Sequence, residues 1–102
     1  MSADPALVGG DKLEPLIQRI VADVLVVPLE QVTPDSALVA DLGAESIDFL
    51  DLVFHLEEAL DRRIPFTRWH RYVEERFGTG DLSRTITTSV VRDFAFSVTE
   101  GE

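Results

Sequence analysis

Apolar residues recur at spacings of three and four along much of the chain, and this spacing predicts amphipathic helices. The first predicted helix begins near Asp11, a candidate N-cap, and ends near Val26, because Pro28 follows. Its apolar face consists of Leu13, Leu16, Ile17, Ile20, Val21 and Val24. A second helix is predicted from Ser46 to about Leu60.

The second predicted helix carries two apolar stripes with acidic residues between them. One stripe consists of Ile47, Leu50, Val53 and Phe54. The other consists of Phe49, Leu52, Leu56 and Ala59. We expect one stripe to face the core and the other to be partly exposed, as in a surface that docks a partner protein. The alternative is a helix that is buried on two sides.

Two further helices are predicted in the second half of the chain. Phe66, Trp69, Val73 and Phe77 share one helical face, so a third helix should span 66 to 77, before the Gly-Thr-Gly break at 78–80. A final helix, capped by Thr87 or Thr88, should run to about residue 98. We therefore expect an all-α bundle of about four helices. Residues 27–45 form a long loop between the first two helices, and we divide the chain into a tail (1–10), one domain (11–98) and a C-terminal tail (99–102).

The length of 102 residues indicates a single domain. The sequence contains no cysteine, which excludes disulfides, thiolate metal sites and a cysteine nucleophile. No apolar run approaches the roughly 20 residues of a membrane-spanning helix, so we expect no stable membrane insertion. Residues 1–10 do not resemble a secretory signal, and we expect the protein in the cytoplasm.

The net charge of −10 is concentrated in one segment. Residues 20–61 contain ten acids and neither lysine nor arginine, whereas acids and bases balance in the rest of the chain. This distribution argues against nucleic acid binding and favours a basic protein partner, although acidity can also serve solubility alone. Asp48 and Asp51 lack the spacing of a calcium loop, and no metal site is predicted. We expect intramolecular pairing with acidic neighbours for the arginine cluster of Arg62, Arg63, Arg68, Arg71 and Arg76.

Ser46 is the residue on which the chemistry of the chain could depend. It stands where the long loop meets the second helix, and the free N–H groups and positive dipole end of a helix favour a phosphate there. Ser46 could instead be only an N-cap, since serine is a preferred cap. A full capping box would then require Glu or Gln at the position of Phe49. The residues alone leave both roles open.

The segment DLGAESIDFLDLVFHLEEALDRRIP resembles the signature of the acyl carrier protein family. IVADVLVVPLEQVTPDSALVADLG resembles the first helix and long loop of that family, and ITTSVVRDF resembles the start of its last helix. The resemblance implies that Ser46 carries 4'-phosphopantetheine, which a phosphopantetheinyl transferase donates from coenzyme A. The thiol of the arm would hold an acyl group as a thioester, and partner enzymes would perform the chemistry. Glu45 and Ile47 replace the commoner Asp and Leu of the motif, which bears on the choice of transferase.

The resemblance also implies two further sets of site residues in a monomeric carrier with no catalytic residues of its own. Acyl synthases and acyltransferases with basic docking surfaces would bind at Glu45, Ile47, Asp48, Leu50, Asp51, Phe54 and Glu57. The acyl chain would be sheltered by Leu38, Leu52, Leu56, Ile64, Val91 and Phe94. The alternative for this second set is an ordinary core.

Residues 66–85 form an extension relative to ordinary family members. DFLDLVF followed by IPFTRW is similar to specialised carriers for very long acyl chains on bacterial lipid A. The extension could widen the acyl shelter or simply pack on the bundle. Three functions remain: a carrier for fatty-acid or lipid biosynthesis, a carrier for polyketide or nonribosomal peptide assembly, and an unmodified carrier-like interaction module.

Overall fold

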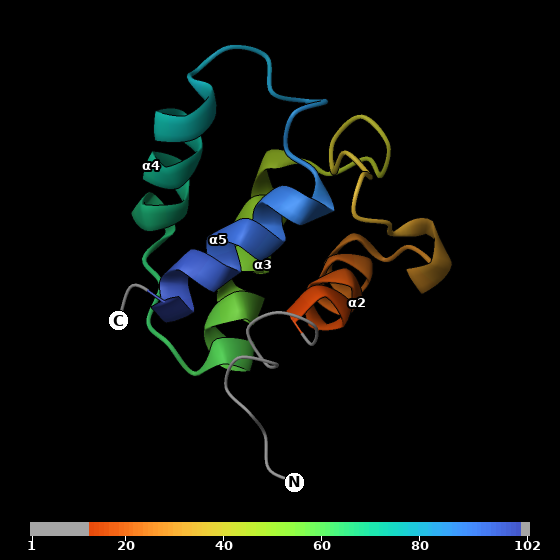
Figure 1. Cartoon of the computed structure of the whole chain (residues 1–102). Coiled ribbons are helices and arrows are strands. Elements are labelled where there is room, and N and C mark those ends of the chain that lie inside the picture. Colours follow the sequence, from red (N-terminus) through yellow and green to blue (C-terminus); the bar gives the residue numbers. More distant parts are fainter. Residues whose placement is uncertain (1–12, 101–102) are drawn as a thin grey trace, which may run out of the picture.

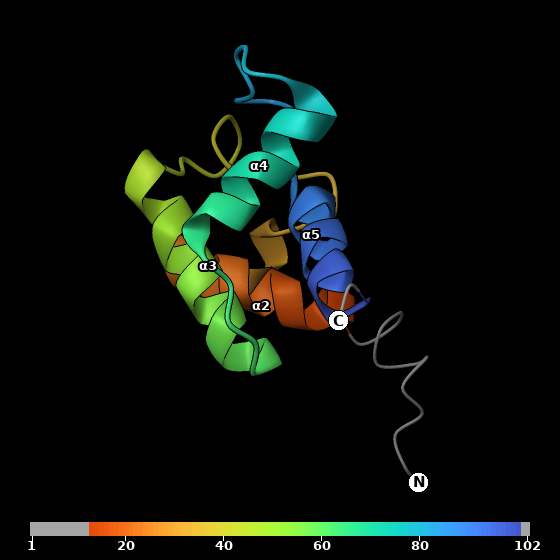
Figure 2. The same cartoon turned by 90° about the vertical axis from the view of Figure 1, so that its left-hand side faces the viewer.

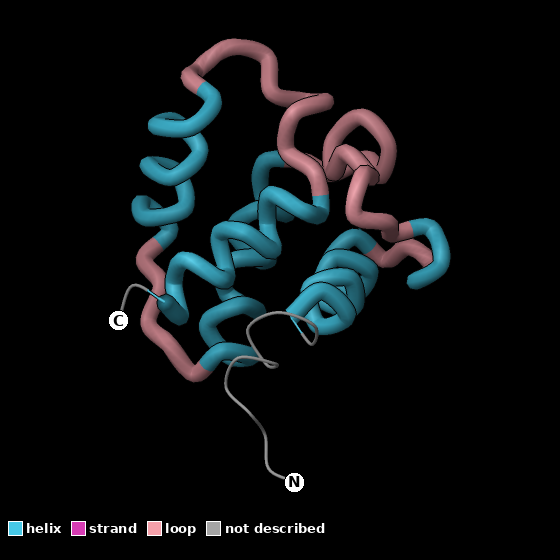
Figure 3. The backbone as a smooth tube through the Cα atoms, viewed as in Figure 1, coloured by secondary structure: helices cyan, strands magenta, loops and turns pink. Residues whose placement is uncertain are grey.

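The computed structural model describes residues 13–100, which form helices joined by loops (Figures 1 and 3). The elements are α2 (Leu13–Leu25), the short 3-10 helix η1 (Leu29–Gln31), α3 (Ser46–Leu60), α4 (Phe66–Phe77) and α5 (Thr88–Glu100). Within residues 13–100 the backbone forms no strand, only an isolated bridge between Ala37 and Thr87. The predicted all-α bundle is confirmed.

The helix bounds agree with the predicted ones apart from three details. The proposed N-cap Asp11 lies outside the described residues, and η1 was not predicted within the long loop. The C-terminal tail predicted from residue 99 is wrong for its first two residues, because α5 continues to Glu100. None of the helices within residues 13–100 has the length and apolar character needed to cross a membrane.

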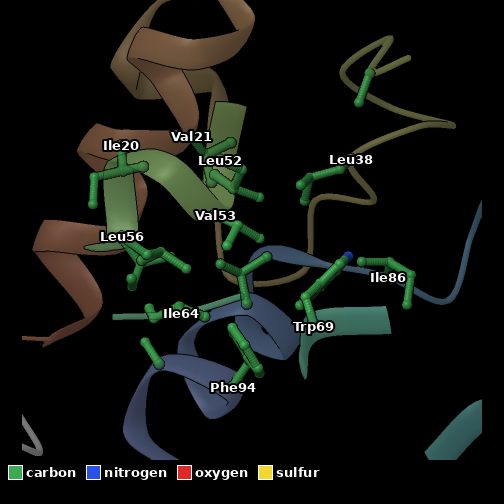
Figure 4. Packing of buried hydrophobic residues seen from close by; sticks show 14 of the residues in the cluster. Ile20, Val21, Leu38, Leu52, Val53, Leu56, Ile64, Trp69, Ile86 and Phe94 are labelled. Atoms are coloured by element: carbon green, nitrogen blue, oxygen red, sulfur yellow. The ribbon is translucent and has the colours of Figure 1, made fainter. Parts of the chain in front are cut away.

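The core lies where α2 packs against both α3 and α5. Ile17 of α2, Leu56 of α3, and Val91 and Phe94 of α5 are fully buried there. Figure 4 shows side chains of the core meeting around Leu56, Ile64 and Phe94. Of the two predicted stripes of α3, the one with Ile47, Leu50 and Phe54 is exposed, and Val53 is its exception. Val53, which was grouped with the exposed stripe of α3, is buried.

The other stripe of α3 holds the opposite exception. Ala59 is exposed, although it was grouped with the residues that pack inward. Leu52 and Leu56 of the same stripe are buried, as expected for the face that meets the core. At 3.6 residues per turn, the stripe from Phe49 to Ala59 covers just under three turns, and Ala59 lies at its edge and not at its centre.

Helix α4 lies across α3 and α5 on the side away from α2 (Figure 2). Its anchor is Trp69, which is only 5% exposed. The Trp69 ring stacks on Phe49 of α3 with centroids 6.0 Å apart and meets Phe94 of α5 edge-on at 5.1 Å. Tyr72 adds a second edge contact to Phe94 at 5.1 Å. Aromatic pairs of this kind contribute about 0.5–1.5 kcal/mol each beyond their buried area.

The long loop between α2 and α3 is bound to the segment that leads into α5. The backbone N–H of Leu38 donates to the carbonyl of Ile86 over 3.0 Å, and Leu38 is 1% exposed. The N–H groups of Thr88 and Ser89 donate to loop carbonyls, over 3.1 and 3.0 Å. These two N–H groups belong to the first turn of α5, which has no partners for them within the helix. The loop therefore caps α5 and is itself held in place.

Candidate attachment site and docking surface

Ser46 is the first residue of α3, and its side chain is exposed. The N-cap is Glu45, with φ −111° and ψ 170°. The backbone N–H of Glu45 donates to Oδ2 of Asp48 over 2.8 Å, as in a capping box. Of the two roles left open for Ser46, that of N-cap falls to Glu45, and the third residue after this cap is Asp48 and not Phe49.

The Ser46 hydroxyl is free of hydrogen bonds to any residue in the described part of the chain. Because Glu45 and Asp48 satisfy the start of α3, the serine has no capping duty. The capping box uses the N–H groups of Glu45 and Asp48, and the N–H groups of Ser46 and Ile47 in the first turn of this 15-residue helix, together with the helix dipole, favour an anionic phosphate there. These observations fit a covalently attached phosphodiester at this position.

The loop just before Ser46 is fixed by its backbone conformation and by hydrogen bonds. Gly43 adopts φ +78°, a left-handed conformation that a residue with a Cβ atom adopts only under strain. Ala44 is 6% exposed, and its N–H donates to the carbonyl of Leu38 over 2.8 Å. Asp41 accepts the N–H of Ala37 over 2.8 Å. The loop thus holds Ser46 in a fixed position at the surface.

An apolar surface follows Ser46 along α3. Ile47, Leu50 and Phe54 are 63%, 49% and 57% exposed. Glu45 and Asp51 are exposed beside them. The structure thus brings five of the seven predicted docking residues together on one open face.

The other two predicted docking residues are engaged within the protein. Asp48 is half-buried and uses Oδ2 to accept the Glu45 N–H. Glu57 is half-buried, and its Oε2 accepts the N–H of Ile64 over 2.7 Å. Glu57 therefore fixes the connection between α3 and α4. Sequence reasoning could not detect this bond, because the two residues lie on different elements.

An apolar cavity of about 480 Å³ lies between α3, α4 and the segment that precedes α5. It is lined by Val39, Phe49, Trp69, His70, Val73, Glu74, Gly78, Thr79, Leu82, Ser83 and Ile86. None of the six residues predicted to shelter an acyl chain lines it. Leu38, Leu52, Leu56, Ile64, Val91 and Phe94 are all at most 2% exposed and lie in the core.

The sequence did carry a signal for part of this cavity. Trp69 and Val73 stand four residues apart on α4, so both face α3 and the core. Leu82 and Ile86 show a similar spacing outside any helix. The extension at 66–85 therefore packs on the bundle and forms one wall of the cavity.

The arginine cluster does not form the ion pairs expected from the sequence. Among the described residues the ion pairs belong to Arg92, which contacts Glu14 and Asp93 at 2.9 Å. Arg76 lies over the ring of Tyr72 with 4.7 Å to the centroid. The expectation of intramolecular pairing is therefore wrong. Long arginine side chains on a surface gain little from such pairs in water, and sequence proximity alone does not form them.

The histidines and acids in the described part of the chain form no set of three that could hold a metal ion. His55 is half-buried, and its Nδ1 lies 2.8 Å from the carbonyl oxygen of Asp51 in the preceding turn. His70 is exposed on α4. His55 stands nine residues after Ser46 on α3, about 13 Å along the helix axis, so it does not lie beside the hydroxyl.

A family described as "Phosphopantetheine attachment site" matches residues 15–72, more than half of the chain and a stretch that includes Ser46. The chain belongs to this family. Members of the phosphopantetheine attachment-site family bind the arm covalently, so 4'-phosphopantetheine is the cofactor of the fold.

Several curated proteins to which this chain is similar are named "Acyl carrier protein AcpXL". The protein from Brucella melitensis is 38% identical over 59 residues, which cover 58% of this chain and 63% of the relative. The proteins from Mesorhizobium japonicum and Rhizobium etli are 32% and 36% identical over 59 residues, again 58% of this chain, and 63% and 64% of the relatives. The matched region thus spans less than two thirds of each of these curated relatives.

Proposed function

We propose that this protein is an acyl carrier protein, in which the hydroxyl of Ser46 is esterified by 4'-phosphopantetheine. The observation that carries the proposal is an exposed serine hydroxyl at the start of α3, without a partner among the described residues, inside the region that matches the attachment-site family. Ser46 supplies the oxygen of the phosphodiester, and the first turn of α3 stabilises its negative charge.

The arm supplies the chemistry that the chain itself lacks. Its terminal thiol forms a thioester with an acyl group, whereas the protein contains no cysteine. The role of the protein is to hold and present the acyl group, and the bond-making steps belong to partner enzymes. We therefore propose a carrier without catalytic activity of its own, acting as a monomer in the cytoplasm, where coenzyme A is available for loading.

We propose the exposed face of α3 as the docking surface for the transferase and for acyl synthases and acyltransferases. Ile47, Leu50 and Phe54 provide an apolar centre, and Glu45 and Asp51 provide acidic charges beside it. A rim charge in water contributes about 0.2–1 kcal/mol, so several give fast and weak association with a basic partner. A carrier that visits several enzymes requires such rapid release.

The acyl group that we propose is a long one, as in the specialised carriers that residues 48–69 resemble. The cavity of about 480 Å³ supports this assignment, because its lining is mainly apolar and includes Phe49 and Trp69. An acyl chain that leaves water for such a lining gains about 0.8 kcal/mol per buried methylene group. Polyketide or peptide intermediates, with more polar groups, would gain less.

The test is mass spectrometry of the protein purified from its own cell, before and after treatment with hydroxylamine, which cleaves thioesters. We expect the mass of the chain plus the arm plus a long acyl group, and then the mass of the chain plus the arm. A polyketide or peptidyl group would assign the carrier to another pathway. If the native protein has the mass of the unmodified chain, the result favours an interaction module. The Ser46→Ala variant provides the reference mass for an unmodified chain, apart from the mass of the substitution.

A further inference from the structure

The connection from α3 into α4 is basic in an otherwise acidic protein. From Arg62 to Val73 the chain carries four arginines and one histidine and no acid, whereas the net charge of the whole chain is −10. Arg62, Arg63 and Arg71 are exposed and Arg68 is half-buried. These four residues are called the arginine surface below. None of them pairs with a carboxylate of residues 13–100.

The arginine surface borders a hollow of about 450 Å³ between α4 and α5. Arg68 and Arg71 line the hollow together with Pro65, Thr67, Tyr72, Glu75 and Ser97, so its lining carries two cations and one carboxylate. Phe94, which is fully buried, also lines it and provides an apolar floor. Guanidinium groups that outnumber the carboxylate around a hollow of mixed polar and apolar lining suit a ligand that combines carboxylates with an apolar side chain, because arginine binds carboxylates in a bidentate manner.

We propose that the arginine surface docks an acidic segment of a partner protein, with one apolar side chain of that segment inserted in the hollow. Charge complementarity favours an acidic occupant. A protein segment fits better than a flat anionic bilayer, because Glu58 and Asp61 of α3 are exposed directly before Arg62. A flat surface would bring these acids near its own charges within the Debye length of about 8 Å, whereas a narrow segment avoids them.

Arg62 and Arg63 follow the end of α3 opposite Ser46, and Arg68 and Arg71 continue the surface onto α4. The 15 residues of α3 separate Arg62 from Ser46, which corresponds to about 20 Å along the helix axis. An acidic partner at the arginine surface therefore leaves Ser46 accessible. If Ser46 carries the arm as proposed above, such a partner can retain the carrier while a basic enzyme acts on the arm.

The test uses the full chain and a synthetic peptide of glutamates with one central leucine, titrated by NMR with the ¹⁵N-labelled protein. We expect saturable shifts at residues 62–71 and around Ser97. The double variant Arg68→Gln/Arg71→Gln should weaken binding by about tenfold or more, since two charge-assisted contacts are lost. Arg84→Gln, which removes an exposed arginine outside the hollow, should change the affinity by less than about twofold.

Three results would overturn the proposal: equal weakening by Arg84→Gln, unchanged binding of the double variant, or binding to phosphatidylglycerol vesicles without binding to the peptide. The fluorescence of Trp69, the single tryptophan, reports that the variants remain folded. Loading of Ser46 by a phosphopantetheinyl transferase is measured with and without saturating peptide, and we expect equal rates. If Ser46 is loaded without the peptide but not with it, the arginine surface and Ser46 are not independent, which contradicts the proposal. Absence of loading in both cases contradicts the carrier function alone.

Discussion

The backbone N–H of Glu45 lies 2.8 Å from Oδ2 of Asp48, and this hydrogen bond fixes the residue at which α3 begins. Because Glu45 and not Ser46 is the N-cap, the serine is the first residue of the helix and its hydroxyl is not used for capping. This bond gives Asp48 a function in the stability of α3, and we propose a second, separate one for its charge in docking. These functions can be separated by substitution.

Asp48→Ala should lower the free energy of unfolding by about 1 kcal/mol, which is the usual loss when a capping acceptor is removed. Asp48→Asn keeps an acceptor oxygen and should cost less. Asp51→Asn removes only a charge, since no side-chain bond involves this exposed residue within residues 13–100, and its stability should stay within about 0.5 kcal/mol. Urea unfolding measures all three. Equal losses for the three variants would contradict this assignment of the cap.

Association kinetics provide the complementary test of the acidic rim. Reversing the charge at Asp48 and Asp51 should slow association with a basic phosphopantetheinyl transferase, and added salt should slow association of the unaltered protein as well. Stopped-flow measurements at several salt concentrations give both rates. Association kinetics that do not depend on salt would count against steering by acids.

Glu57 was predicted to contact partner enzymes, and the structure gives it a different bond. Its Oε2 accepts the N–H of Ile64 over 2.7 Å. Glu57→Ala leaves this N–H without a partner next to a buried side chain, and we expect a loss of about 1–3 kcal/mol in unfolding free energy. Glu58→Ala, one residue further and exposed, should change stability by less than about 0.5 kcal/mol. Similar effects of the two substitutions in urea unfolding would show that the bond contributes nothing.

The fold could be predicted from the sequence wherever helical periodicity was strong. Both ends of α4 could be predicted, because Pro65 and Gly78 flank the helix. One face of the helix carries the apolar residues Phe66, Trp69, Val73 and Phe77. Leu38 of the long loop is buried as well, and its backbone hydrogen bond to Ile86 holds it against the core.

The parts that periodicity missed depend on orientation in three dimensions. Whether Ser46 caps α3 could not be decided from the sequence, because the backbone angles of Glu45 decide it and not the preference of serine for caps. The arginines near α4 were expected to pair with neighbouring acids, but sequence proximity does not set the direction of long side chains. The cavity beside Trp69 is built from several elements and could not be assembled from one stripe.

Val26 ends α2 in a conformation that disfavours a branched side chain. It has φ +56° and is 87% exposed. The N–H of Val27 donates to the carbonyl of Ala22 over 3.1 Å, which closes the helix in the manner of a glycine C-cap. Val26→Gly should therefore raise the unfolding free energy by about 0.5–1 kcal/mol, since glycine adopts this conformation without the Cβ clash.

Val26→Ala is the matched control, because alanine retains Cβ and should gain much less. Thermal unfolding of the two variants beside the unaltered protein distinguishes strain from lost packing. A lower stability of the glycine variant than of the alanine variant would show that the left-handed backbone is not strained at this position.

Tyr72 is the single tyrosine of the chain, so its ionisation can be followed directly by absorbance. Burial raises the pKa of Tyr72 above its ordinary value, the nearby Arg76 cation opposes this shift, and Asp93 adds to it. Arg76→Gln should therefore raise the pKa of Tyr72 further. Because the folded state holds the proton more tightly, the stabilising contribution of Tyr72 is complete below the ordinary pKa of about 10 and is lost as the pH rises through the folded value.

The measurement is a titration of tyrosinate absorbance in native protein and in concentrated urea, with Arg84→Gln as a control of equal charge change. We expect a higher midpoint in the native protein than in urea, and no effect of the control. A lower midpoint in the Arg76→Gln variant than in the unaltered protein would contradict the proximity of the guanidinium to the ring.

The most direct test of the whole account is the reaction of the purified chain with coenzyme A and a broad-range phosphopantetheinyl transferase, followed by peptide mass spectrometry. The account predicts the mass of one arm per chain, located on the peptide that contains Ser46, full loading of the Ser89→Ala control and no loading of Ser46→Ala. A chain that remains unmodified, or an arm found on any residue other than Ser46, would contradict it.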